Sequence, residues 1–130
     1  MRGETLDKLA GTWCAQHTGQ ATRVRSEVAA PLTEQAECDG TVCLATIQAE
    51  AAANARLATV GRFGRRKARD EHRAATEQAQ TARAAVRQVW EAQPPRTLGA
   101  LSEWAAQVAE RRAENDPRVS AADHAVEAAR

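Results

Sequence analysis

Apolar residues recur every three or four positions along most of the chain, and no run of β-branched residues alternates with polar ones. This spacing is that of amphipathic α-helices, whereas half-buried strands would show the alternation. A chain of 130 residues is expected to form one domain. The pattern therefore predicts an all-α protein, with residues 1–130 forming a single elongated helical bundle or hairpin array of four to six helices around one long alanine-rich helix.

The N-terminal segment, residues 1–40, is predicted to hold two helices. An apolar face over about residues 4–17 is followed by Thr18-Gly19, which favours a helix end. A second helix should start near Thr22. It should break or kink at Pro31, because proline costs about 3 kcal/mol in a helix interior.

The central segment, residues 41–93, contains no proline, and about a third of it is alanine, a strong helix former. Residues 38–41 read Cys-Asp-Gly-Thr, which is typical of a turn with Thr41 as the N-cap of the helix that follows. Pro94 supplies the end of the segment. We expect a long helix or a helical hairpin here.

Two apolar stripes compete within this central segment. The longer has the heptad spacing of a coiled coil and consists of Leu44, Ile47, Ala51, Asn54, Ala58, Gly61, Arg65, Ala68, His72, Ala75, Ala79, Ala82, Val86 and Val89. The shorter lies beside it and consists of Ala53, Leu57, Val60 and Gly64. Either one helix buries both stripes, or residues 61–64 form a turn between antiparallel helices. We favour the continuous or slightly bent helix, because the sequence on both sides favours helix, although each glycine costs about 1 kcal/mol there.

Two further helices are predicted in residues 97–130, after Pro94-Pro95. Thr97 should cap the first, and Asp116 the second with Pro117 at its first helical position. Their apolar faces consist of Leu98, Leu101, Trp104, Ala105 and Val108 in the first helix and of Val119, Ala122, Val126 and Ala129 in the second. Trp90 and Trp104 flank the proline turn and are predicted to form a local core.

The composition limits the core that these helices can bury. About 31 of the 130 residues are alanine, whereas Leu, Ile, Val and Phe make up about 14% of the chain, below the roughly 20% that hints at disorder. The net charge of only +1 argues against disorder. Because each buried CH₂ contributes roughly 0.8 kcal/mol, we expect a thin core that gains stability from another protein or from self-association.

Charge is distributed unevenly along the chain. Residues 1–50 carry about −3, residues 51–90 about +6 and residues 91–130 about −2. The basic cluster consists of Arg62, Arg65, Arg66, Lys67, Arg69 and Arg73. Either it is a solvated helix face that pairs with the acidic terminal segments, or it contacts the phosphates of a nucleic acid. Only Phe63 could stack on a base there.

The three cysteines and one histidine form a candidate metal site in the first third of the chain. Cys14 and His17 lie one helical turn apart, and Cys38 and Cys43 could complete a tetrahedral zinc site from a turn. The alternatives are a Cys38–Cys43 disulfide or reduced cysteines packed as small apolar side chains. We favour the reduced cysteines and expect no cofactor.

No catalytic signature is present. His72 and His124 have no evident acid or base partner, and no nucleophile stands beside a base. The chain is therefore predicted not to be an enzyme. Uncharged runs such as Thr41 to Ala49 are too short to span a membrane, no signal-peptide pattern is present, and an odd, sparse set of cysteines is not a secreted disulfide framework. These features predict a cytoplasmic protein.

The segment Leu101–Val119 reads LSEWAAQVAERRAENDPRV. Its W-A-x₂-V-A-x-R-R and D-P-R-V patterns resemble the helical C-terminal region of actinobacterial conjugative relaxases of the TraA (MobF) type. The resemblance covers about residues 60–130 and implies a non-catalytic accessory region of the DNA-transfer machinery of a mobile element. The family's nicking tyrosine, histidine metal triad and helicase phosphate loop have no counterpart here, so no functional residue carries over.

Together these observations predict a non-enzymatic helical protein-interaction or assembly module. Its partner would be another protein or a second copy of the chain, bound through the alanine-rich seam. The alternative is a nucleic-acid-binding protein that uses the basic cluster around residues 62–73.

Overall fold

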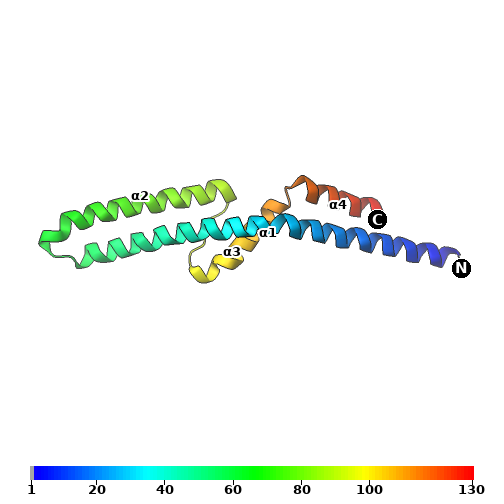
Figure 1. The fold of residues 1–130 in the computed structure, drawn as a ribbon, viewed down its shortest axis with the longest axis horizontal. Coiled ribbons are helices and arrows are strands. Elements are labelled where there is room, and N and C mark those ends of the chain that lie inside the picture. The colour runs from blue at the N-terminus through cyan, green and yellow to red at the C-terminus, as the bar shows by residue number, and fades with distance from the viewer. Residues whose placement is uncertain (1) are drawn as a thin grey trace. The chain divides into compact units, whose positions relative to one another are not determined.

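The computed structural model describes the backbone of residues 2–130 and the side chains of residues 10–130. Its α-helices are α1 (Arg2–Thr59), α2 (Arg65–Trp90), α3 (Leu101–Ala113) and α4 (Pro117–Ala129), with two short 3₁₀ helices, η1 (Arg62–Gly64) and η2 (Leu98–Ala100) (Figure 1). The all-α prediction is confirmed. The longest helix is α1, and it packs against the other three helices.

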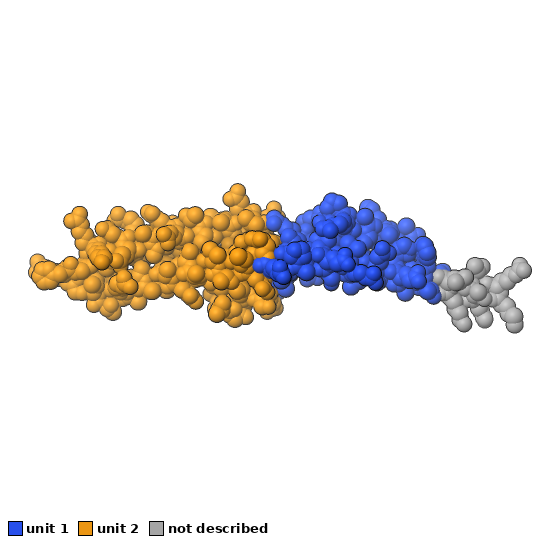
Figure 2. Space-filling view, viewed as in Figure 1, with its two compact units in different colours: residues 1–34, 106–130 blue, residues 35–105 orange. Residues whose placement is uncertain are grey.

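The chain divides into two compact units (Figure 2). Unit 1 comprises residues 1–34 and 106–130, and unit 2 comprises residues 35–105. Both α1 and α3 contribute residues to each unit.

Unit 1 is held by a small core between α1 and the C-terminal segment. Val28, Ala113 and Val119 are buried together there. Beside this core, the Nη2 atom of Arg25 lies 3.0 Å from the Oδ2 atom of Asp123. Distant parts of the sequence are thus joined by one apolar cluster and one ion pair.

Unit 2 is an antiparallel helical hairpin formed by the C-terminal part of α1 and by α2 (Figure 1). Its direction follows from two ion pairs that join the helices: Arg56 to Glu71 at 2.8 Å and Arg83 to Glu50 at 3.4 Å. The buried apolar side chains of α1 and α2 in this unit are Ala36, Cys43, Leu44, Ala68, Ala79, Val86 and Trp90. Most of them are small, as the composition predicted.

The helix ends predicted at Thr18-Gly19 and residues 38–41 and the break considered at Pro31 are wrong, because α1 continues through all three. The Thr41 hydroxyl does not cap a helix; it donates to the Glu37 carbonyl oxygen at 2.6 Å, one turn back within α1.

Pro31 is tolerated because its neighbours on either side carry the apolar stripe of unit 1. Val28 belongs to the buried core, and Leu32 packs against it. A helix break would withdraw these side chains from the core, and burying an aliphatic side chain is worth about 1.5–3 kcal/mol. Tertiary packing thus opposes the cost of the proline. The longest helix is consequently α1 rather than a central helix beginning near Val42.

The favoured continuous helix through residues 61–64 is also wrong; the hairpin alternative is correct. Gly61 is extended, with φ −76° and ψ 178°, and α2 starts after η1. A Cβ atom on Gly64 would lie 2.6 Å from the Cγ2 atom of Val60. The glycine therefore permits the close approach that the turn requires.

The turn also decides which stripe of α1 faces α2. Leu57 and Val60, from the shorter predicted stripe, are half-buried, whereas Ala51, Asn54 and Ala58 of the longer stripe are exposed. In α2 the longer stripe is the one that packs inward, as predicted: its members from Ala68 to Val86 are buried or half-buried.

The helix starts predicted near the C-terminus are confirmed. The Thr97 hydroxyl accepts a hydrogen bond from the Ala100 N–H at 3.2 Å, at the start of η2. The Asp116 carboxylate accepts one from the Arg118 N–H at 2.8 Å, with Pro117 at the first position of α4. Leu98, in contrast, is exposed rather than part of the apolar face.

Candidate functional site

The closed end of the hairpin, formed by η1 and the first turns of α2, carries the densest positive charge of the described residues. All six members of the basic cluster, Arg62, Arg65, Arg66, Lys67, Arg69 and Arg73, are exposed. Phe63 lies among them with its side chain entirely open to solvent, at 102% exposure. An aromatic ring and six cations are thus presented on one short segment.

Very little of this charge is neutralised within the described part of the chain. Lys67 is the only cluster member with an ion pair there, at 4.0 Å from Glu71 of the same helix. Glu71 makes its shorter contact with Arg56 of α1. The predicted pairing of the cluster with acidic terminal segments is not seen among these residues.

A shallow groove runs between α1 and α2 beside the basic cluster. Its volume is about 360 Å³, and its lining residues are Leu57, Arg69, His72, Arg73, Thr76 and Glu77. The Thr76 hydroxyl oxygen is buried there without a hydrogen-bond partner. A buried hydroxyl in that state costs roughly 1–3 kcal/mol, and a rotation of the Thr76 side chain toward the groove would place it beside two arginines.

A second groove, of about 170 Å³, lies elsewhere between the same two helices. It is lined by Asp39, Val42, Cys43, Ala82, Ala85, Val86 and Val89. Val42 is 58% exposed and Val89 is 41% exposed. This groove is apolar, and two of its larger side chains face solvent.

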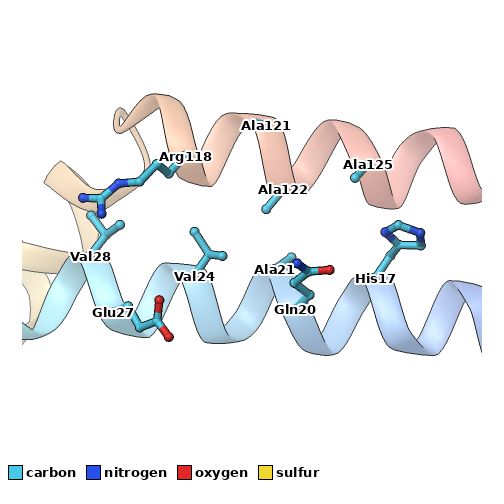
Figure 3. A pocket seen from close by; sticks show the side chains of 10 residues that line it. All are labelled: His17, Gln20, Ala21, Val24, Glu27, Val28, Arg118, Ala121, Ala122 and Ala125. Carbon is cyan, nitrogen blue, oxygen red and sulfur yellow. The ribbon is translucent and has the colours of Figure 1, made fainter.

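Unit 1 has a groove of its own between α1 and α4, of about 420 Å³. Figure 3 shows Val24, Val28 and His17 directed from α1 toward α4, and Ala122 directed back toward α1. The width of the groove follows from the small side chains on α4, of which Ala121 also lines it.

The four predicted zinc ligands are not brought together. All lie on α1, where 24 residues at a rise of 1.5 Å separate Cys14 from Cys38 by about 36 Å. The described residues contain no group of three or more potential ligands that could hold a metal ion. His17 instead packs edge-on against Trp13, with 4.6 Å between the ring centroids.

The cysteines have three different environments, and all three are free thiols. Cys43 is buried between the hairpin helices, Cys14 is half-buried and Cys38 is exposed. Burial raises the pKa of the Cys43 thiol, and the nearby charges of Arg83 and Arg87 partly oppose this. Burial in the hairpin core thus makes the Cys43 thiol harder to ionise than a free thiol.

The two tryptophans near the proline turn are anchored by their indole N–H groups. Trp90 donates to the Asp39 carboxylate at 2.9 Å and is buried. Trp104 donates to the Gln93 carbonyl oxygen at 2.7 Å and is half-buried. Trp90 thus belongs to the buried core, as predicted, whereas Trp104 lies at its edge.

Sequence reasoning missed Leu57, Thr76 and Val42 as surface features. Leu57 was assigned only to an apolar stripe, and Thr76 was assigned no role. Other threonines of α1 and α2, such as Thr18, Thr22 and Thr81, donate a hydrogen bond to a carbonyl oxygen one turn back. No signal in the sequence distinguishes Thr76 from them. Only the packing distinguishes Thr76.

Comparison with protein-family models, with curated proteins and with solved structures gives no match. The link to conjugative DNA transfer therefore stays a prediction from the C-terminal residues alone. Among the described helices, none combines the length and the apolar content needed to cross a membrane.

Proposed function

We propose that this chain is a non-enzymatic assembly module that associates with a second copy of itself through the α1–α2 groove lined by Val42 and Val89. The observation that carries the proposal is the exposure of these two valines, 58% and 41%, at an apolar groove between two helices. An antiparallel hairpin with one apolar face open is half of a four-helix bundle.

The small size of the buried core supports association. Val119 and Cys43 are the largest fully buried side chains among the described residues. Side chains of this size bury few methylene groups, each worth roughly 0.8 kcal/mol. A partner that covers the open groove would add apolar burial that the single chain lacks, and binding to the native state raises its stability.

The charge pattern favours a second copy over a charged partner. The exposed residues one helical turn from Val42 and Val89 on α1 and α2 are Cys38, Ala45 and Ala85, all uncharged. Asp39, the charged residue that lines the groove, accepts a hydrogen bond from the Trp90 indole. In a two-fold symmetric dimer each patch meets its own copy, and like charges placed opposite each other would be unfavourable. This surface avoids that cost.

The proposal is tested by size-exclusion chromatography with light scattering over a range of concentrations. The natural chain is expected to approach twice its 14.0 kDa monomer mass as concentration rises, and its melting temperature should rise with concentration. Val42→Glu should shift the mass to that of the monomer, because it places two like charges against each other in the dimer.

Ala55→Glu is the matched control. Ala55 is exposed on α1, thirteen residues from Val42, and lines none of the grooves described above, so this variant should dimerise as the natural chain does. Circular dichroism shows whether each variant keeps its helices. A natural chain that stays monomeric, with a melting temperature independent of concentration, would overturn the proposal.

A further inference from the structure

We propose that the basic side of α2 is a binding surface for single-stranded nucleic acid. Its phosphates lie along the arginines of the cluster and in the groove at Thr76, and a base stacks on Phe63. This surface is separate from the assembly groove, and the inference does not depend on dimerisation.

The arginines of α2 lie on one side of the helix. At about 100° per residue, Arg65, Arg66, Arg69 and Arg73 fall within about 100° of the helix circumference. Val89 and Ala85, which line the assembly groove, fall on the other side of the buried positions. The two surfaces of α2 therefore face different directions, and one can be occupied without blocking the other.

The length of the stripe suits an extended polyanion. From Arg65 to Arg73 the cluster extends about 12 Å along α2, at a rise of 1.5 Å per residue, and Arg62 precedes it in η1. Its five arginines have no ion pair within the described residues. A protein that places such cations against phosphates releases the condensed counterions of the nucleic acid, and this release drives binding.

The groove beside the arginines of α2 offers a place for a phosphate. Arg69, Arg73 and Thr76 line the same hollow, and Leu57 provides an apolar wall. The Thr76 oxygen is buried without a hydrogen-bond partner. A phosphate oxygen seated here would neutralise the arginines, and it would accept a hydrogen bond from that hydroxyl once the Thr76 side chain rotates toward the groove. Glu77 lines the same groove and marks the end of the basic surface.

Phe63 supplies the aromatic surface on which a base can stack. Its ring is fully exposed in η1, between the two glycines of the turn. Base-on-aromatic stacking is the sequence-tolerant element of single-strand binding, and positively charged grooves supply the rest. In a duplex the faces of the bases are stacked on one another and are closed to Phe63. A membrane surface would receive only one apolar side chain, because the arginines continue along the helix away from Phe63.

The binding test is fluorescence anisotropy with a labelled thymidine oligonucleotide, at about 50 mM salt and then at increasing salt. We expect saturable binding to the natural chain that weakens as salt rises. Arg69→Ala with Arg73→Ala should lower the slope of log affinity against log salt by about 1.4, since each lost contact to a single strand contributes about 0.7.

The matched control removes two arginines elsewhere. Arg23 and Arg111 are exposed, lie outside the cluster and have no ion pair within the described residues. Arg23→Ala with Arg111→Ala changes the net charge equally and should leave the slope as in the natural chain. Equal slopes for both double variants would overturn the assignment of the surface, because only total charge would then matter.

Phe63 and Thr76 have separate readouts. Phe63→Ala should weaken binding by about 5- to 150-fold with little change in salt slope, and Phe63→Trp should restore it. Thr76→Val should weaken binding about tenfold or more, yet raise the melting temperature of the free chain, because a buried hydroxyl without a partner is removed. Unchanged affinity in Thr76→Val would overturn the phosphate seat in the groove.

Two competitors distinguish the other polyanions. A duplex of the same length that binds as tightly as the single strand, with Phe63→Ala unaffected, would overturn the stacking on Phe63. Binding to phosphatidylserine vesicles without binding to the oligonucleotide would overturn the proposal in favour of a membrane surface. Preference for the single strand over both supports it.

Discussion

The Nε1 atom of Trp90 donates a hydrogen bond of 2.9 Å to the Oδ2 atom of Asp39, joining the end of α2 to α1 across 51 positions of sequence. The other oxygen of the same carboxylate accepts from the Nε2 atom of Gln35 at 2.9 Å. Trp90 is 4% exposed. A polar contact therefore fixes the open end of the hairpin, opposite the turn at residues 61–64.

Asp39→Ala is expected to lower the free energy of unfolding by about 1–3 kcal/mol, because the indole N–H of Trp90 would be left buried without an acceptor. Asp39→Asn keeps an acceptor oxygen and should cost less. Urea unfolding followed by circular dichroism measures both. Glu37→Ala removes an exposed carboxylate from the same helix; if it cost as much as Asp39→Ala, the hydrogen bond would not be the cause.

Gly40→Ala and Gly19→Ala should have opposite effects, although both glycines lie inside α1. Alanine is favoured over glycine by about 1 kcal/mol in a helix interior. At Gly19 an added Cβ meets nothing within 4 Å, so the variant should be stabilised by about that amount.

At Gly40 the added Cβ would lie 2.5 Å from the Leu101 Cδ1 atom, 3.1 Å from the Trp104 Cζ3 atom and 3.4 Å from the Pro95 Cγ atom. Leu101 would have to turn away beside a rigid ring, at a cost of about 1–3 kcal/mol. Thermal unfolding of the two variants checks this expectation. A gain in Gly40→Ala equal to that in Gly19→Ala would show that α3 does not pack closely here.

Alkylation should distinguish the three thiols in the order Cys38, Cys14, Cys43. The thiolate is the reactive form, and Cys43 is both buried and raised in pKa by that burial. Mass spectrometry after limited treatment with iodoacetamide at neutral pH gives the order directly. In denaturant the three rates should converge. Early modification of Cys43 in the native chain would mean that the hairpin opens readily.

The stability of the folded chain should depend on the charge of Asp116 at pH values below the ordinary pKa of a carboxyl group. Its hydrogen bonds from the Arg118 side chain and backbone lower the pKa of the carboxyl. A lowered folded-state pKa gives stability that is fully present above the unfolded value of about 3.9 and is lost as pH falls through the folded value. Asp116→Asn keeps a capping oxygen without the charge.

The melting temperatures of the natural chain and Asp116→Asn are therefore expected to differ at neutral pH and to converge as the pH falls below the ordinary carboxyl range. A difference that stays constant over this range would show that the charge of Asp116 has no part in capping α4.

Helix starts with local chemistry could be predicted, and helix ends that depend on distant residues could not. Thr97 and the Asp116-Pro117 pair act through atoms within three residues, so their roles are readable from the sequence. Pro31 and Gly40 were misread as breaks, since the side chains that keep α1 continuous around them come from α3 and the residues beyond it.

The candidate functional site could likewise be predicted only in part. The basic cluster and Phe63 were identified from helical spacing alone. The orphan hydroxyl of Thr76 and the exposure of Val42 depend on which face of each helix the hairpin buries, and two stripes of almost equal quality left that open. The zinc site failed because it needed a turn where α1 is continuous.

By itself the sequence determined the helical class, the small core and the placement of positive charge, because these follow from residue type and from the period of 3.6 residues. Tertiary structure decided where α1 ends, which stripe is buried and which side chains remain exposed. The physical reason is that alanine-rich faces differ little in burial energy. A few specific contacts, such as Val60 against Gly64 and Trp90 with Asp39, then select one packing among several.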